Sequence, residues 1–90
     1  MHPLAFLEVN MIRVMVNGAG GKMGREVVKA VHADSELTMI GGIDPSKAGQ
    51  DVGTVAGIEP LHITMAETID EVLSDNKPDV IVDFTNPAVI

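Results

Sequence analysis

The stretch Gly18-Ala19-Gly20-Gly21-Lys22-Met23-Gly24 decides the fold of this chain. It lies between an apolar run at 12–17 and a segment at 22–32 whose apolar residues recur with helical spacing. Such a strand, glycine-rich turn and helix start are typical of phosphate binding, because glycine lets the anion approach the backbone and the first helical N–H groups face it. The stretch therefore predicts dinucleotide binding. A tight strand-to-helix turn without a ligand is the alternative interpretation.

Patterns for strands and helices alternate along the rest of the chain. Strands are predicted at 12–17, 37–43 and 79–84, with a weaker one at 61–64, and helices at about 22–32 and after residue 64. The spacing of Thr64 and Glu67 indicates a capping box for the second helix, which Asn76-Lys77-Pro78 should end. Residues 47–57 are expected to form a loop with one short helical turn.

This alternation predicts an α/β fold, a Rossmann-type parallel sheet with right-handed βαβ crossovers. Residues 1–10 are interpreted as a leader or an added extension, because Met11 opens the first strand and resembles a natural start. Residues 11–90 are then the amino-terminal part of a dinucleotide-binding domain.

Composition narrows the range of partners. A formal net charge of −7 argues against nucleic acid, whose phosphates attract basic surfaces. The chain has no cysteine, which suits a cytoplasmic protein, and no apolar stretch near the ~20 residues that span a membrane. No metal site is expected, because the histidines share no ligand spacing and the acids of the second helix form a solvated face. These residues are His2, His32 and His62, and Glu67, Asp70, Glu71 and Asp75.

An acidic residue ends the second predicted strand. Asp44 follows Gly24 by twenty residues, where an acid can accept hydrogen bonds from the adenosine ribose and repel a 2′-phosphate. An Asx turn before Pro45 is the alternative role for Asp44. Since Lys47 lies nearby and can attract a 2′-phosphate, both NADH and NADPH remain open as cofactors.

The segment Asp83-Phe84-Thr85-Asn86-Pro87 follows the third strong strand. Ligands bind outside the carboxyl ends of such strands, so this segment should border the cofactor. It is equally consistent with a turn organised by Asp83 and Asn86.

Two motifs together carry a family resemblance. Val16-Asn17-Gly18-Ala19-Gly20-Gly21-Lys22-Met23-Gly24-Arg25 and Asp83-Phe84-Thr85-Asn86-Pro87 resemble the 4-hydroxy-tetrahydrodipicolinate reductases of the lysine and diaminopimelate pathway. Asp51-Val52-Gly53 with Ala56-Gly57 is a weaker match. The resemblance covers residues 11–90, the amino-terminal third of a member.

The resemblance implies roles for particular residues. The turn would contact the pyrophosphate and adjoining ribose of NADH or NADPH through Gly18, Ala19, Gly20, Gly21, Lys22 and Met23. Asp44 would hold the adenosine ribose, and Phe84 and Thr85 would flank the nicotinamide. The family's substrate-binding and tetramer-forming domain, which grips a cyclic dicarboxylate and supplies a proton, has no counterpart in these residues. The chain alone is therefore expected to bind cofactor at most and to contain no catalytic residue.

Two other readings stay open. One is another Rossmann dehydrogenase, such as a semialdehyde or homoserine dehydrogenase, which Asp83-Phe84-Thr85 argues against. The other is a non-enzymatic nucleotide-binding sensor module.

Overall fold

The computed structural model describes residues 11–74 and 77–84. The predicted leader and the predicted helix stop at Asn76 lie outside them. In chain order the elements are β1 (Ile12–Asn17), α2 (Lys22–Ala33), β2 (Leu37–Ile43), the 3-10 helix η1 (Pro45–Lys47), α3 (Val52–Ala56), α4 (Ile69–Leu73) and β3 (Val80–Asp83).

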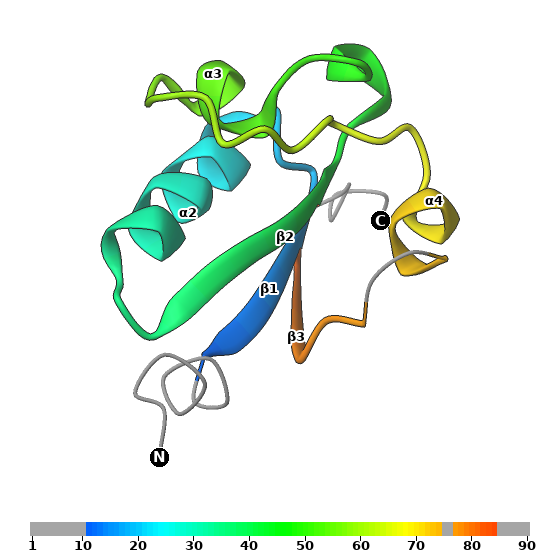
Figure 1. Cartoon of the computed structure of the whole chain (residues 1–90). Coiled ribbons are helices and arrows are strands. Elements are labelled where there is room, and N and C mark those ends of the chain that lie inside the picture. Colours follow the sequence, from blue (N-terminus) through cyan, green and yellow to red (C-terminus); the bar gives the residue numbers. More distant parts are fainter. Residues whose placement is uncertain (1–10, 75–76, 85–90) are drawn as a thin grey trace.

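The strands form one sheet in the order β2-β1-β3, and both strand pairs are parallel. Helix α2 lies on one side of the sheet and α4 on the other, with α3 near the carboxyl end of β2 (Figure 1). The predicted α/β fold with parallel strands is confirmed. The order also matters for function, because it puts the carboxyl end of β1 between those of β2 and β3.

The central residues of β1, Val14 to Val16, are buried on both faces, as its nearly continuous apolar sequence predicts. Val14 and Val16 face α2 and pack in a cluster with Val28, while Met15 packs on the opposite face with Val72 of α4. The sheet is thus covered on both sides of β1, whose last residue leads directly into the glycine-rich turn.

Two local predictions are wrong. Residues 61–64 form no strand; Thr64 makes one isolated antiparallel bridge to Asp51. Thr64 and Glu67 form no capping box, because α4 begins later, after Thr68. The Glu67 N–H instead donates to the carboxylate of Glu71, at 2.9 Å. The start of α4 is thus stabilised by Glu71, an acid within the helix, and the contact pairs Glu67 with Glu71 where Thr64 and Glu67 had been predicted.

The third strand is shorter than predicted, but both flanking residues still bond to β1. The Asp79 N–H donates to the Arg13 carbonyl oxygen at 2.8 Å, and the Phe84 N–H donates to that of Asn17 at 2.9 Å. Phe84 is therefore fixed beside the end of β1, although it lies outside the ladder.

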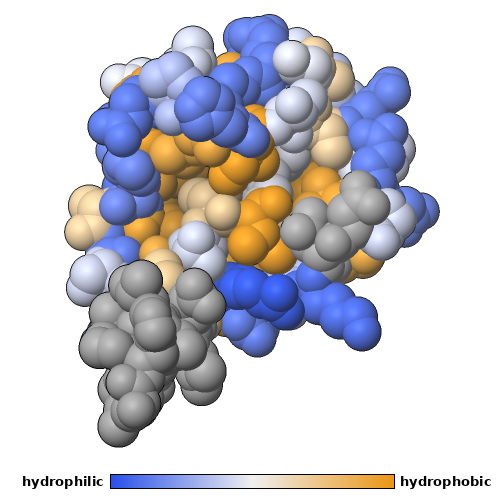
Figure 2. Space-filling view, viewed as in Figure 1, coloured by the Kyte–Doolittle hydropathy of each residue, from blue (hydrophilic) through white to orange (hydrophobic). Residues whose placement is uncertain are grey.

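Apolar surface remains on the folded chain. On the face seen in Figure 2 it gathers near the middle and is bordered by hydrophilic residues. On β3, Val80 and Ile81 are 45% and 44% exposed. None of the helices in the described part of the chain is both long and apolar enough to cross a bilayer.

Candidate functional site

The turn between β1 and α2 is tied to the end of β2. The N–H groups of Gly18 and Ala19 both donate to the carbonyl oxygen of Ile43, at 2.7 and 3.1 Å. Gly18 has a φ of +88°, which L side chains rarely adopt, and a Cβ added to it would lie 3.3 Å from the Phe84 carbonyl carbon. The turn is therefore anchored on both sides, by β2 and by the residue that follows β3.

Asp44 holds the centre of this turn. Its Oδ2 accepts a hydrogen bond from the Gly20 N–H at 3.0 Å, across 24 positions of sequence. A Cβ on Gly20 would collide with this carboxylate and with the side-chain stem of Lys47. Glycine at position 20 therefore leaves the room in which Asp44 approaches the backbone.

The other oxygen of Asp44 has local donors. Oδ1 accepts from the N–H of Ser46 at 3.0 Å and from its hydroxyl at 2.8 Å. Asp44 is thereby the N-cap of η1, which confirms the Asx-type turn before Pro45. The acid also lies at the glycine turn, through its contact with Gly20, and its role at the adenosine ribose stays a prediction.

The start of α2 is open to an anion. Gly21 is the N-cap and has no side chain to cap the helix, and the first turn contains no acidic residue. A Cβ on Gly21 would meet only the Gly18 carbonyl oxygen, at 3.6 Å, so packing within the chain does not require glycine there. Lys22 is exposed beside it. N–H groups at a helix start combine with the helix dipole to favour a negative charge.

A hollow of about 370 Å³ lies between this helix start and the end of β3. Its walls are formed by Gly18, Gly21, Lys22, Met23, Gly24, Asp83 and Phe84. The structure thus brings residues of the turn together with Phe84, whereas Asp44 lies on the β2 side of the turn. Thr85, Asn86 and Pro87 lie outside the described residues.

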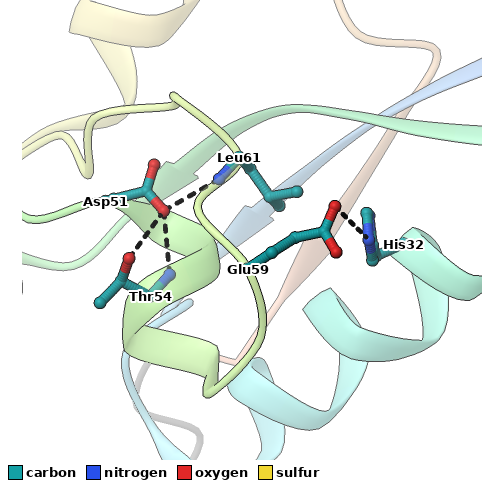
Figure 3. A network of polar contacts seen from close by, with 5 residues as sticks. All are labelled: His32, Asp51, Thr54, Glu59 and Leu61. Carbon is teal, nitrogen blue, oxygen red and sulfur yellow. Dashed lines mark hydrogen bonds and ion pairs between the residues drawn. The ribbon is translucent and has the colours of Figure 1, made fainter.

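The loop after Asp44 is fastened by a second acid, Asp51 (Figure 3). Its Oδ2 accepts from the N–H and hydroxyl of Thr54 at 2.9 and 3.2 Å and from the Leu61 N–H at 3.0 Å. Its Oδ1 accepts from the Ile63 N–H at 3.0 Å. Partial burial raises the pKa of Asp51, but these hydrogen bonds outweigh it and hold the pKa well below its ordinary value.

Other predicted features lie away from this turn. His32 of α2 approaches Glu59, with 3.7 Å between Nε2 and Oε2, and both side chains are exposed (Figure 3). Within residues 11–74 and 77–84, no three or more His, Asp or Glu side chains are arranged to hold a metal ion. Of the four acids predicted to form a solvated face, Glu67, Asp70 and Glu71 are exposed, and Asp75 lies outside the described residues.

Sequence reasoning missed two contributors to the site. Ser46 gave no signal beyond its place two residues after the acid, although that spacing is common in Asx turns. The structural need for Gly20 was also missed, since the glycines were read as serving a ligand. The contact between Gly20 and Asp44 is indicated by two features together: an additional glycine in the motif and an acid at the end of the next strand.

The parallel sheet, the anchored glycine turn and the open helix start define a Rossmann-type α/β dinucleotide-binding fragment. Residues 12–90 match the family described as "Dihydrodipicolinate reductase, N-terminus". The chain belongs to this family, as its two sequence motifs predicted.

Individual relatives agree with this assignment. The chain is similar to proteins named 4-hydroxy-tetrahydrodipicolinate reductase from Syntrophomonas wolfei (46% identity), Cyanothece sp. (48%) and Synechocystis sp. (45%). The alignments cover 87%, 84% and 88% of this chain, but only 29%, 30% and 31% of those relatives. The chain thus spans less than a third of the length of these relatives.

Proposed function

We propose that this chain is the amino-terminal part of the cofactor-binding domain of a cytoplasmic reductase. The complete enzyme would use NADH or NADPH to reduce 4-hydroxy-tetrahydrodipicolinate to tetrahydrodipicolinate in lysine and diaminopimelate biosynthesis. Its cyclic dicarboxylate substrate would bind to a further domain, which also forms a homotetramer. Family membership and the names of the relatives support this proposal.

The observation that carries the proposal is the unexplained glycine at the start of α2. Contacts within the chain account for Gly20 and Gly24, whose Cβ atoms would collide with Asp44 and with the Gly18 backbone, respectively. A Cβ on Gly21 would make only an ordinary contact with the Gly18 carbonyl oxygen, and Gly21 lines the hollow, so we infer that its lack of a side chain serves something outside the chain. A pyrophosphate at the helix start fits this requirement.

The sheet order supports an orientation for the dinucleotide. Asp44 follows β2 and Phe84 follows β3, on opposite sides of the turn after β1. Gly18 to Met23 would bind the pyrophosphate, Asp44 the adenosine ribose, and Phe84 with Thr85 the nicotinamide side. The stem of Lys47 lies beside Gly20, so its ammonium group can also reach a 2′-phosphate. Both cofactors are compatible with these side chains.

The residues of this chain would contribute binding and orientation. When bound, the nicotinamide would supply the hydride, and the 4-hydroxyl of the substrate would leave as water once a proton is added. Asp44 and the turn would hold the adenosine half at a fixed distance from Phe84, and a fixed position of the donor lowers the barrier to transfer. The protonating group would belong to the substrate domain.

A substitution at Gly21 tests the proposal directly. Gly21 has a φ of −81° and ψ of 174°, which other residues adopt readily, so Gly21→Val should fold normally. Its branched side chain should obstruct the phosphate and weaken NADH binding about tenfold or more, measured by calorimetry or NMR titration. Ala33→Val, at the other end of α2, is the matched control and should bind like the unsubstituted chain. Equal binding by both variants would refute the phosphate site.

A further inference from the structure

Asp44 uses three hydrogen bonds to fix both of its carboxylate oxygens before any ligand arrives. Two of the donors are backbone N–H groups, those of Gly20 and Ser46. The third, the Ser46 hydroxyl, is the only side chain among them and makes the shortest contact, at 2.8 Å to Oδ1.

We propose that Ser46 is a positioning residue for cofactor recognition, whose hydroxyl holds the Asp44 carboxylate in the orientation that receives the adenosine ribose. The inference rests on the proposed function, because it assumes that Asp44 accepts a hydrogen bond from the 2′-hydroxyl of the adenosine ribose. It adds that discrimination between NADH and NADPH depends on a residue that need not touch the cofactor.

The reason lies in the geometry of a carboxylate. With donors on Oδ2 from the β1 turn and on Oδ1 from η1, both the position and the plane of the group are set. A carboxylate has about four acceptor sites, and three are occupied, so the remaining acceptor capacity has one defined direction. Without the hydroxyl, Oδ1 keeps a single donor. The carboxylate then has more conformational entropy, which is lost when the ribose binds.

Removal of the Ser46 hydroxyl should strongly weaken the binding only of a cofactor with a free ribose diol. NADPH carries a phosphate on the 2′ oxygen, so it lacks the hydroxyl that would donate a hydrogen bond to Asp44. A general loosening of the turn would weaken both cofactors alike, because both contain the same pyrophosphate. The split between NADH and NADPH therefore separates positioning of Asp44 from structural damage.

The experiment compares NADH and NADPH binding to the chain and its variants by calorimetry, with circular dichroism as a check on folding. Ser46→Ala should weaken NADH binding about two- to tenfold and change NADPH binding less. Ser46→Thr keeps the hydroxyl and should restore NADH affinity. Ser74→Ala is the control, because that serine also donates one hydrogen bond but belongs to the end of α4.

The outcomes distinguish a failure of the Ser46 role from a failure of the proposed function. If Asp44→Ala weakens NADH binding while Ser46→Ala does not, the positioning role is overturned and the proposed function stands. Equal losses for NADH and NADPH in Ser46→Ala, or no rescue by Ser46→Thr, overturn the positioning role too. If the unsubstituted chain binds neither cofactor, the proposed function fails, and the role of Ser46 fails with it.

Discussion

Replacing Asp51 by alanine should lower the free energy of unfolding more than replacing an exposed carboxylate does. The substitution removes the acceptor for the N–H groups of Thr54, Leu61 and Ile63. Loss of the N-cap of α3 costs about 1 kcal/mol. Each of the two part-buried N–H groups of Leu61 and Ile63 adds about 1 kcal/mol when left without a partner. The free energy of unfolding should therefore fall by about 3 kcal/mol, out of a total of about 5–15 kcal/mol for a small domain.

Urea denaturation followed by circular dichroism measures this difference at pH 7. Glu36→Ala is the control, because Glu36 is an exposed carboxylate in the turn before β2, and its loss should change stability by less than about 0.5 kcal/mol. If Asp51→Ala lost no more stability than Glu36→Ala, the hydrogen bonds to Asp51 would contribute nothing net to the fold.

Acid provides an independent check on the same carboxylate. The pKa of Asp51 is lowered in the folded chain, so its stabilising contribution is fully present above the ordinary aspartate pKa of about 3.9. The contribution is lost as the pH falls from there toward the folded pKa. The stability difference between the unsubstituted chain and Asp51→Ala should accordingly shrink below about pH 4. A difference that stays constant on acidification would contradict the assignment.

Two further substitutions test close contacts at glycine. Gly20→Ala should displace the Asp44 carboxylate and weaken NADH binding about tenfold in a calorimetric titration, and unchanged affinity would show that this contact is dispensable. Gly41→Ala should push its new methyl group into Val72 and lower the free energy of unfolding by about 1–3 kcal/mol, whereas an unchanged urea midpoint would mean that α4 shifts freely over β2.

The continuous apolar strands were the most predictable part of the fold. β1 and β2 occupy the predicted ranges, and α2 extends one residue beyond the predicted 22–32. Burial of their central residues makes such runs mostly apolar, so their ends are visible where polar residues gather. The glycine turn was predictable for a similar reason, since its spacing between a strand and a helix leaves few alternatives.

The segment around residues 61–64 could not be predicted, because its structure depends on a distant side chain. The N–H groups of Leu61 and Ile63 bond to the carboxylate of Asp51, where a strand would have offered them to a ladder. A short run of apolar residues has the same pattern in both cases. The start of α4 was misplaced because a capping-box spacing at Thr64 occurs by chance, while Thr68 precedes the actual helix.

The double attachment of Asp44 links cofactor choice to folding free energy. Because its carboxylate bonds to the Gly20 N–H and also caps η1, replacing it to favour NADPH would remove structural hydrogen bonds together with the negative charge. Cofactor preference can therefore be changed with less loss of stability by substituting neighbours of Asp44 than by substituting Asp44 itself. Additional positive charge near Lys47 would attract a 2′-phosphate and leave the acid, the turn and the 3-10 helix in place.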